Sequence, residues 1–326
     1  MSSKKIRVLI VDDSLFMRAA IAKTLPPAQF EIAGQAKDGK DALDKIASLT
    51  PDVVTMDFNM PGMNGAETVR AIMQQRPTPV VMFSAHTRQG ARETFDALAA
   101  GAVDFVTKPS GEVSIDLSAI SEELTRKLTA AATAKPRAAS TVIPTRLSGP
   151  ITIPRTTLTG SLPRLCVIAV STGGPAALSE LLPALPADLR LAMVIVQHMP
   201  AHFTAGERPM PGTVLIAPGD KHVEFDDNGA IVLTDGPLVN GCRPAADVTM
   251  MSAARVYGRR TVAVVMTGMG RDGAAGAQAI KRAEGKTLAQ DQATSVIFGM
   301  PKAAVDTGAI DEVCALGDIA SWLRYA

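Results

Sequence analysis

The sequence predicts an α/β protein built from two doubly wound domains, and three observations lead to this fold class. Short runs rich in β-branched residues alternate with helix-length segments along most of the chain. A stretch rich in proline and small polar residues interrupts this alternation once. Polar residues suited to chemistry follow directly after several apolar runs. We therefore expect one domain over residues 1–128, a linker over 129–161 and a second domain over 162–326.

Five β-rich runs divide the first domain, and helix-length segments such as Met17–Leu25 and Arg88–Ala99 lie between them. Repeated βα units predict a parallel sheet covered on both faces, as in a flavodoxin-like (βα)5 fold. The expected strands are Ile6–Val11, Glu31–Gln35, Val53–Met56, Val80–Phe83 and Ala102–Val106.

The linker is recognised by its prolines, which recur among Ala, Ser, Thr and Arg without any apolar period. Proline removes a backbone donor and resists helix formation, so this stretch is expected to be partly extended. Apolar runs then resume and predict a second parallel-sheet domain of the α/β hydrolase-like kind. The expected strands are Leu165–Val170, Ala192–Val196, Val214–Ala217, Ile231–Thr234, Thr261–Met266, Thr287–Ala289 and Val313–Leu316.

Composition restricts the class of protein. The 326 residues are 47% hydrophobic and 20% charged, which is typical of chains that bury real cores. A net charge of +1 provides no general attraction to nucleic acid or to an anionic membrane. No apolar run approaches the roughly 18 residues of a membrane span. We expect a cytoplasmic protein with no nucleic-acid partner and no membrane insertion.

An acidic pocket is expected at the carboxyl edge of the first sheet. Asp12 and Asp13 follow the first strand and Asp57 follows the third, and these strand ends are neighbours in a doubly wound sheet. Converging carboxylates repel one another unless a hard cation such as Mg²⁺ binds them. Ser84 and Lys108 end two further strands, and a carboxylate beside Mg²⁺, a lysine and a hydroxyl is suited to accept a phosphoryl group. The alternative is a helix cap plus a loop acid, but the joint placement favours the acceptor.

Three motifs of this domain resemble the receiver domain of two-component response regulators: Val11–Ser14, Met56–Gly65 and Asp104–Pro109. The resemblance covers residues 5–128. It implies that a histidine kinase phosphorylates Asp57, and that Ser84, Phe105 and Lys108 sense the phosphate. It further implies a Mg²⁺ site formed by Asp13, Asp57 and the carbonyl of Asn59, with Asp12 close by.

The second domain contains a candidate catalytic triad. Ser171, His198 and Asp272 each follow the end of an expected strand. A serine hydroxyl needs an imidazole to take its proton, and the imidazole needs a carboxylate to orient it. Taken singly, the three residues are explained as a helix cap, a structural histidine and a turn residue. Their joint placement favours the triad. The other histidines are expected in surface loops: His86, His202 and His222.

A competing pattern is Gly268-x-Gly270-x-x-Gly273, which follows a strand and has Asp291 about twenty residues on, as in dinucleotide-binding domains. Against this, Asp272 would place a carboxylate where the pyrophosphate must bind, and the pattern comes late in its domain. A receiver fused to an oxidoreductase is therefore retained only as an alternative.

Motifs along the second domain resemble the chemotaxis protein-glutamate methylesterases, in which a receiver precedes a serine-hydrolase-like effector. They are Ser171–Pro175, Gln197–Pro200, Ala217–Asp220, Arg243–Val248, Thr267–Gly273 and Phe298–Pro301. The resemblance implies Ser171 as nucleophile, His198 as base and Asp272 as its orienting acid, with oxyanion donors at the N–H groups of Thr172 and Met269. It implies hydrolysis of glutamate methyl esters on chemoreceptors without a cofactor, and glutamine deamidation by the same groups.

One departure from the family pattern affects the function. The family usually has a further helix and strand where this chain has only Ala201–Ile216, and Gly206–Pro209 is interpreted as a join across the gap. Our main hypothesis is a phosphorylation-activated esterase. The alternative is a catalytically impaired receptor-binding module under receiver control.

Overall fold

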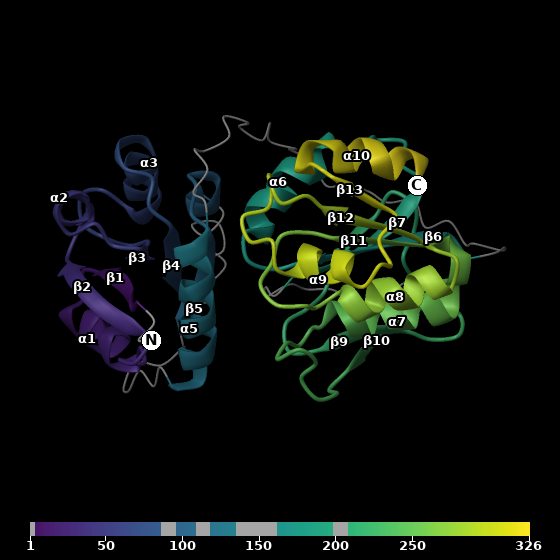
Figure 1. The fold of residues 1–326 in the computed structure, drawn as a ribbon, viewed down its shortest axis with the longest axis horizontal. Coiled ribbons are helices and arrows are strands. Elements are labelled where there is room, and N and C mark those ends of the chain that lie inside the picture. The colour runs from purple at the N-terminus through teal and green to yellow at the C-terminus, as the bar shows by residue number, and fades with distance from the viewer. Residues whose placement is uncertain (1–3, 86–95, 109–117, 135–161, 198–207) are drawn as a thin grey trace. The chain divides into compact units, whose positions relative to one another are not determined.

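The computed structural model describes residues 4–85, 96–108, 118–134, 162–197 and 208–326. The chain divides into two compact units, residues 1–141 and 142–326. Each unit is organised around a parallel sheet (Figure 1). Within the described ranges, no helix has the length and apolar character needed to pass through a bilayer.

The sheet of the first unit has five strands in the order β2-β1-β3-β4-β5, all parallel. This is the flavodoxin-like order that the alternating pattern predicts. The chain leaves β1 toward β2 and then crosses to β3, so the strand order reverses between β1 and β3. The strands are β1 Ile6–Val11, β2 Phe30–Ala36, β3 Val53–Asp57, β4 Val80–Ala85 and β5 Asp104–Lys108.

The helices α1, α2 and α3 of the first unit begin at polar caps that the sequence supplies. The Ser14 hydroxyl accepts the N–H of Met17 at the start of α1, and Asn64 and Glu67 form a capping box at α3. The last helix, α5, runs through Thr133, beyond the expected boundary at residue 128. The bounds are α1 Leu15–Thr24, α2 Gly39–Leu49, α3 Gly65–Gln75 and α5 Ser118–Thr133, and residues 96–99 are also helical. Most of the expected linker, residues 135–161, lies outside the described residues.

The sheet of the second unit has six parallel strands in the order β13-β12-β11-β6-β7-β8. The chain proceeds from β6 outward through β7 to β8 and returns to β11 on the other side. The strand order therefore reverses between β6 and β11. The strands are β6 Arg164–Val170, β7 Leu191–Gln197, β8 Val214–Ile216, β11 Thr261–Val265, β12 Lys286–Gln290 and β13 Glu312–Cys314.

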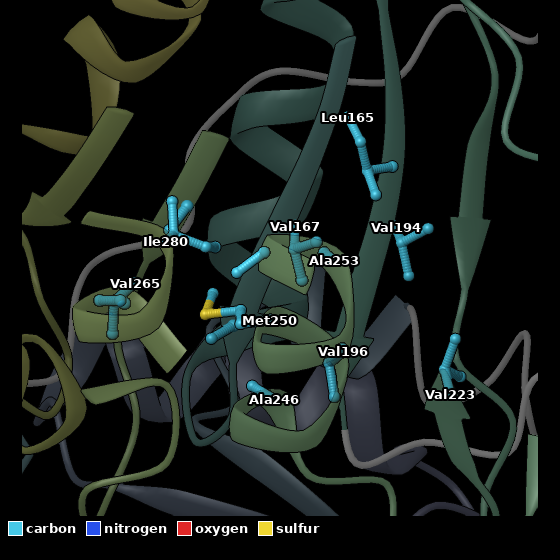
Figure 2. Packing of buried hydrophobic residues seen from close by; sticks show 14 of the residues in the cluster. Leu165, Val167, Val194, Val196, Val223, Ala246, Met250, Ala253, Val265 and Ile280 are labelled. Carbon is cyan, nitrogen blue, oxygen red and sulfur yellow. The ribbon is translucent and has the colours of Figure 1, made fainter. Parts of the chain in front are cut away.

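Side chains of alternating residues fill two core layers, one on each face of this sheet. Val167 belongs to the layer under α7, α8 and α9, and Figure 2 shows it with Met250 of α7 and Ile280 of α8. Ile168 belongs to the opposite layer, under α6 and α10. The helices are α6 Gly174–Ala184, α7 Ala246–Tyr257, α8 Ala274–Arg282, α9 Met300–Asp306 and α10 Leu316–Tyr325, with a 3-10 turn at Gly258–Arg260.

The structure corrects three expectations for this unit. Ile231–Thr234 is a strand, β10, but it pairs antiparallel with β9, His222–Phe225, in a separate two-stranded sheet. The sequence patterns missed β9. His222, expected on the surface, is 2% exposed, because this hairpin packs against α7. The last strand ends at Cys314, and Leu316 already begins α10.

Candidate functional site

An acidic pocket lies at the carboxyl ends of β1 and β3, where the strand order of the first sheet reverses. Asp12, Asp13 and Asp57 each offer a carboxylate oxygen, and these oxygens lie within 4.8 Å of one another. Lys108 ends β5, and its Nζ lies 2.8 Å from Asp57 Oδ1 and 3.1 Å from Asp12 Oδ2. The structure thus brings together the acids and the lysine that the sequence predicts.

The electrostatics of the pocket suit an acceptor that also binds a cation. Asp12 and Asp57 are buried, while Asp13 is exposed. Burial raises the pKa of Asp57, the ammonium of Lys108 opposes this rise, and the carboxylate of Asp12 adds to it. Clustered oxygen ligands that repel one another fit a small divalent cation such as Mg²⁺.

The other residues predicted for this pocket are placed less completely. Asn59 follows β3 and is exposed, and Ser84 lies in β4, although its side chain is outside the described part. Phe105 is 7% exposed, and Nζ of Lys127 lies 4.8 Å from its ring centroid. Lys127 also donates to the carbonyl of Phe105 and forms an ion pair with Asp104. These contacts join α5 to β5, the strand that ends with Lys108.

Ser171 lies directly after β6 and is 3% exposed. Its N–H donates to the carbonyl of Thr267 at 3.0 Å, which joins the end of β6 to the segment after β11. Gly174 donates back to the Ser171 carbonyl at 2.7 Å and begins α6. The serine thus occupies the strand-to-helix turn that the sequence predicts, at the point where the strand order reverses.

Thr172 lies in this turn, and the loop that holds Met269 approaches Ser171 at Gly268. Thr172 is fully buried, and Met269 is 37% exposed in the loop after β11. Among the described residues, neither N–H has a hydrogen-bond acceptor. Donors held by the fold without an internal partner can stabilise a developing oxyanion. This arrangement is compatible with the predicted oxyanion donors.

Asp272 precedes α8 and is 3% exposed. Its carboxylate accepts the N–H of Ala246 at 2.6 Å and of Asp247 at 3.0 Å, and so caps α7, a helix distant in sequence. Burial raises the pKa of Asp272, and these backbone donors oppose the rise. The expected orienting acid is therefore rigidly held and also has a structural role as a helix cap.

Two further polar residues surround Asp272, and the sequence patterns did not identify them as site residues. Asn240 Nδ2 donates to Asp272 Oδ1 at 3.1 Å and to Asp247 Oδ2 at 2.8 Å. Asp247 is 4% exposed and accepts the N–H of Gly276 in the first turn of α8 at 2.7 Å. The available sequence signals were the turn dipeptide Asn240-Gly241 and an acid in the first turn of a helix.

His198 lies outside the described residues, so the structure does not place the imidazole. The strand that precedes it, β7, ends at Gln197 and pairs with β6 through Val170 and Gln197. Gln197 Nε2 donates to the Ser171 carbonyl at 3.4 Å. The three predicted triad residues therefore follow three adjacent strands, β11, β6 and β7.

Comparison with known proteins then identifies the family. The model for the response regulator receiver domain matches residues 8–118, and the model for CheB methylesterase matches residues 166–206 and 203–323. A protein-glutamate methylesterase/protein-glutamine glutaminase of Symbiobacterium thermophilum is 44% identical over 99% of this chain and 97% of its own length. The chain belongs to the CheB methylesterase family. A family member from Pyrococcus abyssi is 42% identical over 98% of this chain and 93% of its own length.

The second unit is similar to a crystal structure of the CheB methylesterase catalytic domain from Thermotoga maritima. The match covers 50% of this chain and 98% of the crystallised domain, with 37% sequence identity and a TM-score of 0.48. The family match over the second unit comes in two pieces that overlap at residues 203–206. This is where the sequence predicts a segment shortened relative to the family. Residues 201–207 of that segment lie outside the described residues, and its last residues form β8.

The dinucleotide-binding alternative is not supported. A pyrophosphate would need the free N–H groups at the start of α8. In the structure the carboxylate of Asp247 already accepts the N–H of Gly276 there, and Asp272 adds a second buried carboxylate beside it. Negative charge at this helix end excludes a phosphate, and the matched family is one of hydrolases.

Proposed function

We propose that this protein is a phosphorylation-activated esterase that hydrolyses glutamate methyl esters on chemoreceptors during chemotactic adaptation. Full-length relatives named protein-glutamate methylesterase/protein-glutamine glutaminase support the reaction. The single structural observation that carries the proposal is the placement of Ser171 and Asp272 after neighbouring strands, β6 and β11, with β7 leading to His198 on the other side.

In the proposed reaction, His198 removes the proton of the Ser171 hydroxyl as its oxygen attacks the ester carbonyl. Collapse of the tetrahedral intermediate breaks the bond to the methoxy group, which leaves as methanol with the proton from His198. Water then attacks the acyl-enzyme, again with His198 as base, and releases glutamate and Ser171. Asp272 keeps the imidazole oriented and balances the positive charge that it gains.

The N–H groups of Thr172 and Met269 are proposed to donate to the oxyanion of both tetrahedral intermediates. Loss of one such donor typically lowers kcat by about 10²–10³-fold. The N-terminus of α6 adds a favourable electrostatic potential beside Ser171. Because acyl transfer from an amide uses the same groups, receptor glutamines are a second substrate, and ammonia replaces methanol as the leaving group.

The receiver supplies the control. We propose that a chemotaxis histidine kinase in the cytoplasm transfers a phosphoryl group to a carboxylate oxygen of Asp57, with Lys108 and Ser84 binding the phosphate oxygens. Asp12, Asp13, Asp57 and Asn59 would hold Mg²⁺, whose charge neutralises the transferring oxygens. We further propose that the unmodified receiver inhibits hydrolysis by the second unit and that phosphorylation relieves this inhibition.

Two substitutions test the proposal in the full-length protein. Ser171→Ala is expected to lower methanol release from methylated receptors by at least about 10³-fold, because the nucleophile is lost, while Asp57 still accepts phosphate. Asp57→Asn is expected to retain basal hydrolysis and to lose stimulation by a small-molecule phosphodonor. Normal hydrolysis by Ser171→Ala would refute the mechanism.

The alternative, a receptor-binding module without catalysis, has no support among the named relatives. It predicts that the purified wild-type chain binds receptor but releases no methanol, with or without phosphodonor. Measuring methanol release therefore separates the two functions directly.

A further inference from the structure

Two buried carboxylates share one amide donor at the proposed catalytic site. Asp272 and Asp247 are 3% and 4% exposed, and both hydrogens of Asn240 Nδ2 are used, one for each acid. Asn240 lies in the loop after β10, whereas the two acids lie at the starts of α8 and α7. Three segments distant in sequence therefore meet in a single hydrogen-bond network.

Backbone donors satisfy only part of this network. Asp272 accepts two N–H groups of α7, and Asp247 accepts the N–H of Gly276 in α8. Burial raises the pKa of Asp272, and the nearby carboxylate of Asp247 raises it further. Asn240 opposes these effects because its amide favours the ionised carboxylate. Among the charged groups that act on Asp272 within the described residues, Asp247 has the largest effect on its pKa.

Turn geometry alone also explains an asparagine at this position. Val239 and Cys242 exchange both backbone hydrogen bonds, and φ is 54° at Asn240 and 73° at Gly241, as in a type I′ turn. Such a turn accepts Asn, Asp or Gly at its first central position. It does not require an amide, so the two roles of Asn240 can be separated by substitution.

We propose that Asn240 is a positioning residue for ester hydrolysis, whose amide fixes the orientation of the Asp272 carboxylate. The inference rests on the proposed function, in which Asp272 orients the base. An ionised carboxylate with one oxygen held by Asn240 presents a fixed acceptor to the imidazole. Without the amide, Asp272 and Asp247 lose their shared donor, and the His198–Asp272 pair binds a proton more tightly.

The test is the pH dependence of kcat/KM for receptor ester hydrolysis by the full-length protein, using Asn240→Gly and Asn240→Asp. Both replacements suit the type I′ turn and both lack the amide donor. At pH 7, Asn240→Gly is expected to lower kcat/KM about tenfold. The acid limb of its pH profile, the pH range over which kcat/KM falls toward acid, is expected to move up by about one pH unit. Asn240→Asp adds a third carboxylate. It is expected to lower kcat/KM by more than Asn240→Gly and to move the acid side of the pH profile further upward.

The control is Asn228→Gly, at an exposed asparagine between β9 and β10, which is expected to leave the pH dependence of kcat/KM unchanged. Thermal unfolding shows whether each variant is folded. An acid limb unchanged from the wild type in both Asn240 variants refutes the inference. A decrease in kcat/KM that is the same at every pH and is accompanied by a lower Tm also refutes it. If Ser171→Ala is inactive in the same assay, only the positioning role fails; if Ser171→Ala is active, the proposed function fails with it.

Discussion

At the scale of single residues, the turn that carries Ser171 depends on a glycine. Gly173 has φ of 77° at the N-cap of α6, a conformation that residues with a Cβ rarely adopt. A Cβ there would also lie 2.6 Å from Cβ of Val296. Backbone conformation and side-chain packing therefore both exclude a larger residue. The conformation of the turn that carries Ser171 therefore depends on the glycine itself and on packing against a residue distant in sequence.

We predict that Gly173→Ala destabilises the second unit by more than backbone strain alone. Gly212→Ala is the matched control, because Gly212 has φ of 78° and nothing within 4 Å of its added Cβ. We expect a cost of roughly 1 kcal/mol for Gly212→Ala. The cost for Gly173→Ala should exceed it by roughly 1–3 kcal/mol, because Val296 must shift. Urea unfolding measures both, and equal costs would contradict the packing argument.

At the scale of elements, the two helices α7 and α8 cap one another. The N-cap residue of α7 is Ala245, whose side chain has no hydrogen-bond acceptor. The carboxylate of Asp272, from the loop before α8, accepts the first N–H groups of α7 instead. Asp247 from α7 in turn accepts an N–H of α8. The carboxylate proposed for catalysis therefore also stabilises the packing of these helices.

We predict a pH-dependent stability difference between the wild type and Asp272→Asn. Burial raises the pKa of Asp272 in the folded state, so the folded protein holds this proton more tightly than the unfolded chain. The resulting stability is fully present below the unfolded pKa and is lost as the pH rises through the folded pKa. The free energy of unfolding of the wild type should therefore fall relative to Asp272→Asn as pH rises from about 4.

Chemical unfolding of the full chain between about pH 4 and 7 tests this, following the transition of the second unit. The control is Gly212→Ala, which changes no titratable group and should give a difference independent of pH. If the free energy of unfolding of the wild type instead rises relative to Asp272→Asn as pH increases over this range, the prediction is wrong.

At the scale of the whole molecule, two separate sheets place chemistry at the same topological position. The acids of the first unit lie where the order reverses between β1 and β3, and Ser171 and Asp272 lie where it reverses between β6 and β11. Crevices form at such points because the connections leave the sheet in opposite directions. The first site gathers carboxylates that suit a divalent cation, whereas the reaction proposed for the second uses a serine nucleophile.

We predict that chelation of divalent cations with EDTA separates the two functions. Stimulation of ester hydrolysis by a phosphodonor should disappear, because phosphoryl transfer to Asp57 needs the cation. Basal hydrolysis should remain within about twofold, because the proposed serine mechanism uses no metal. Asp57→Asn is the control, and its hydrolysis should respond neither to phosphodonor nor to EDTA. Loss of basal hydrolysis on chelation would contradict the assignment.

Much of both sites follows from local sequence. The strand ends before Asp12, Asp57, Ser171 and Asp272 are visible because an apolar run stops where a polar or glycine-rich segment begins, and a parallel sheet gathers such ends at one edge. His198 was predicted by the same pattern, and its role stays a prediction. The type and order of the helices and strands follow from the spacing of apolar residues along the chain.

Only the tertiary structure revealed the surroundings of Asp272. Asn240 and Asp247 reach its carboxylate across 32 and 25 positions of sequence, from elements whose own patterns predict only a turn and a helix start. Burial of His222 and the separate β9–β10 hairpin likewise depend on packing against α7. The residues that end the strands can be predicted from the chain alone, because that information is local. The distant polar groups that contact them cannot, because those contacts exist only after the helices pack.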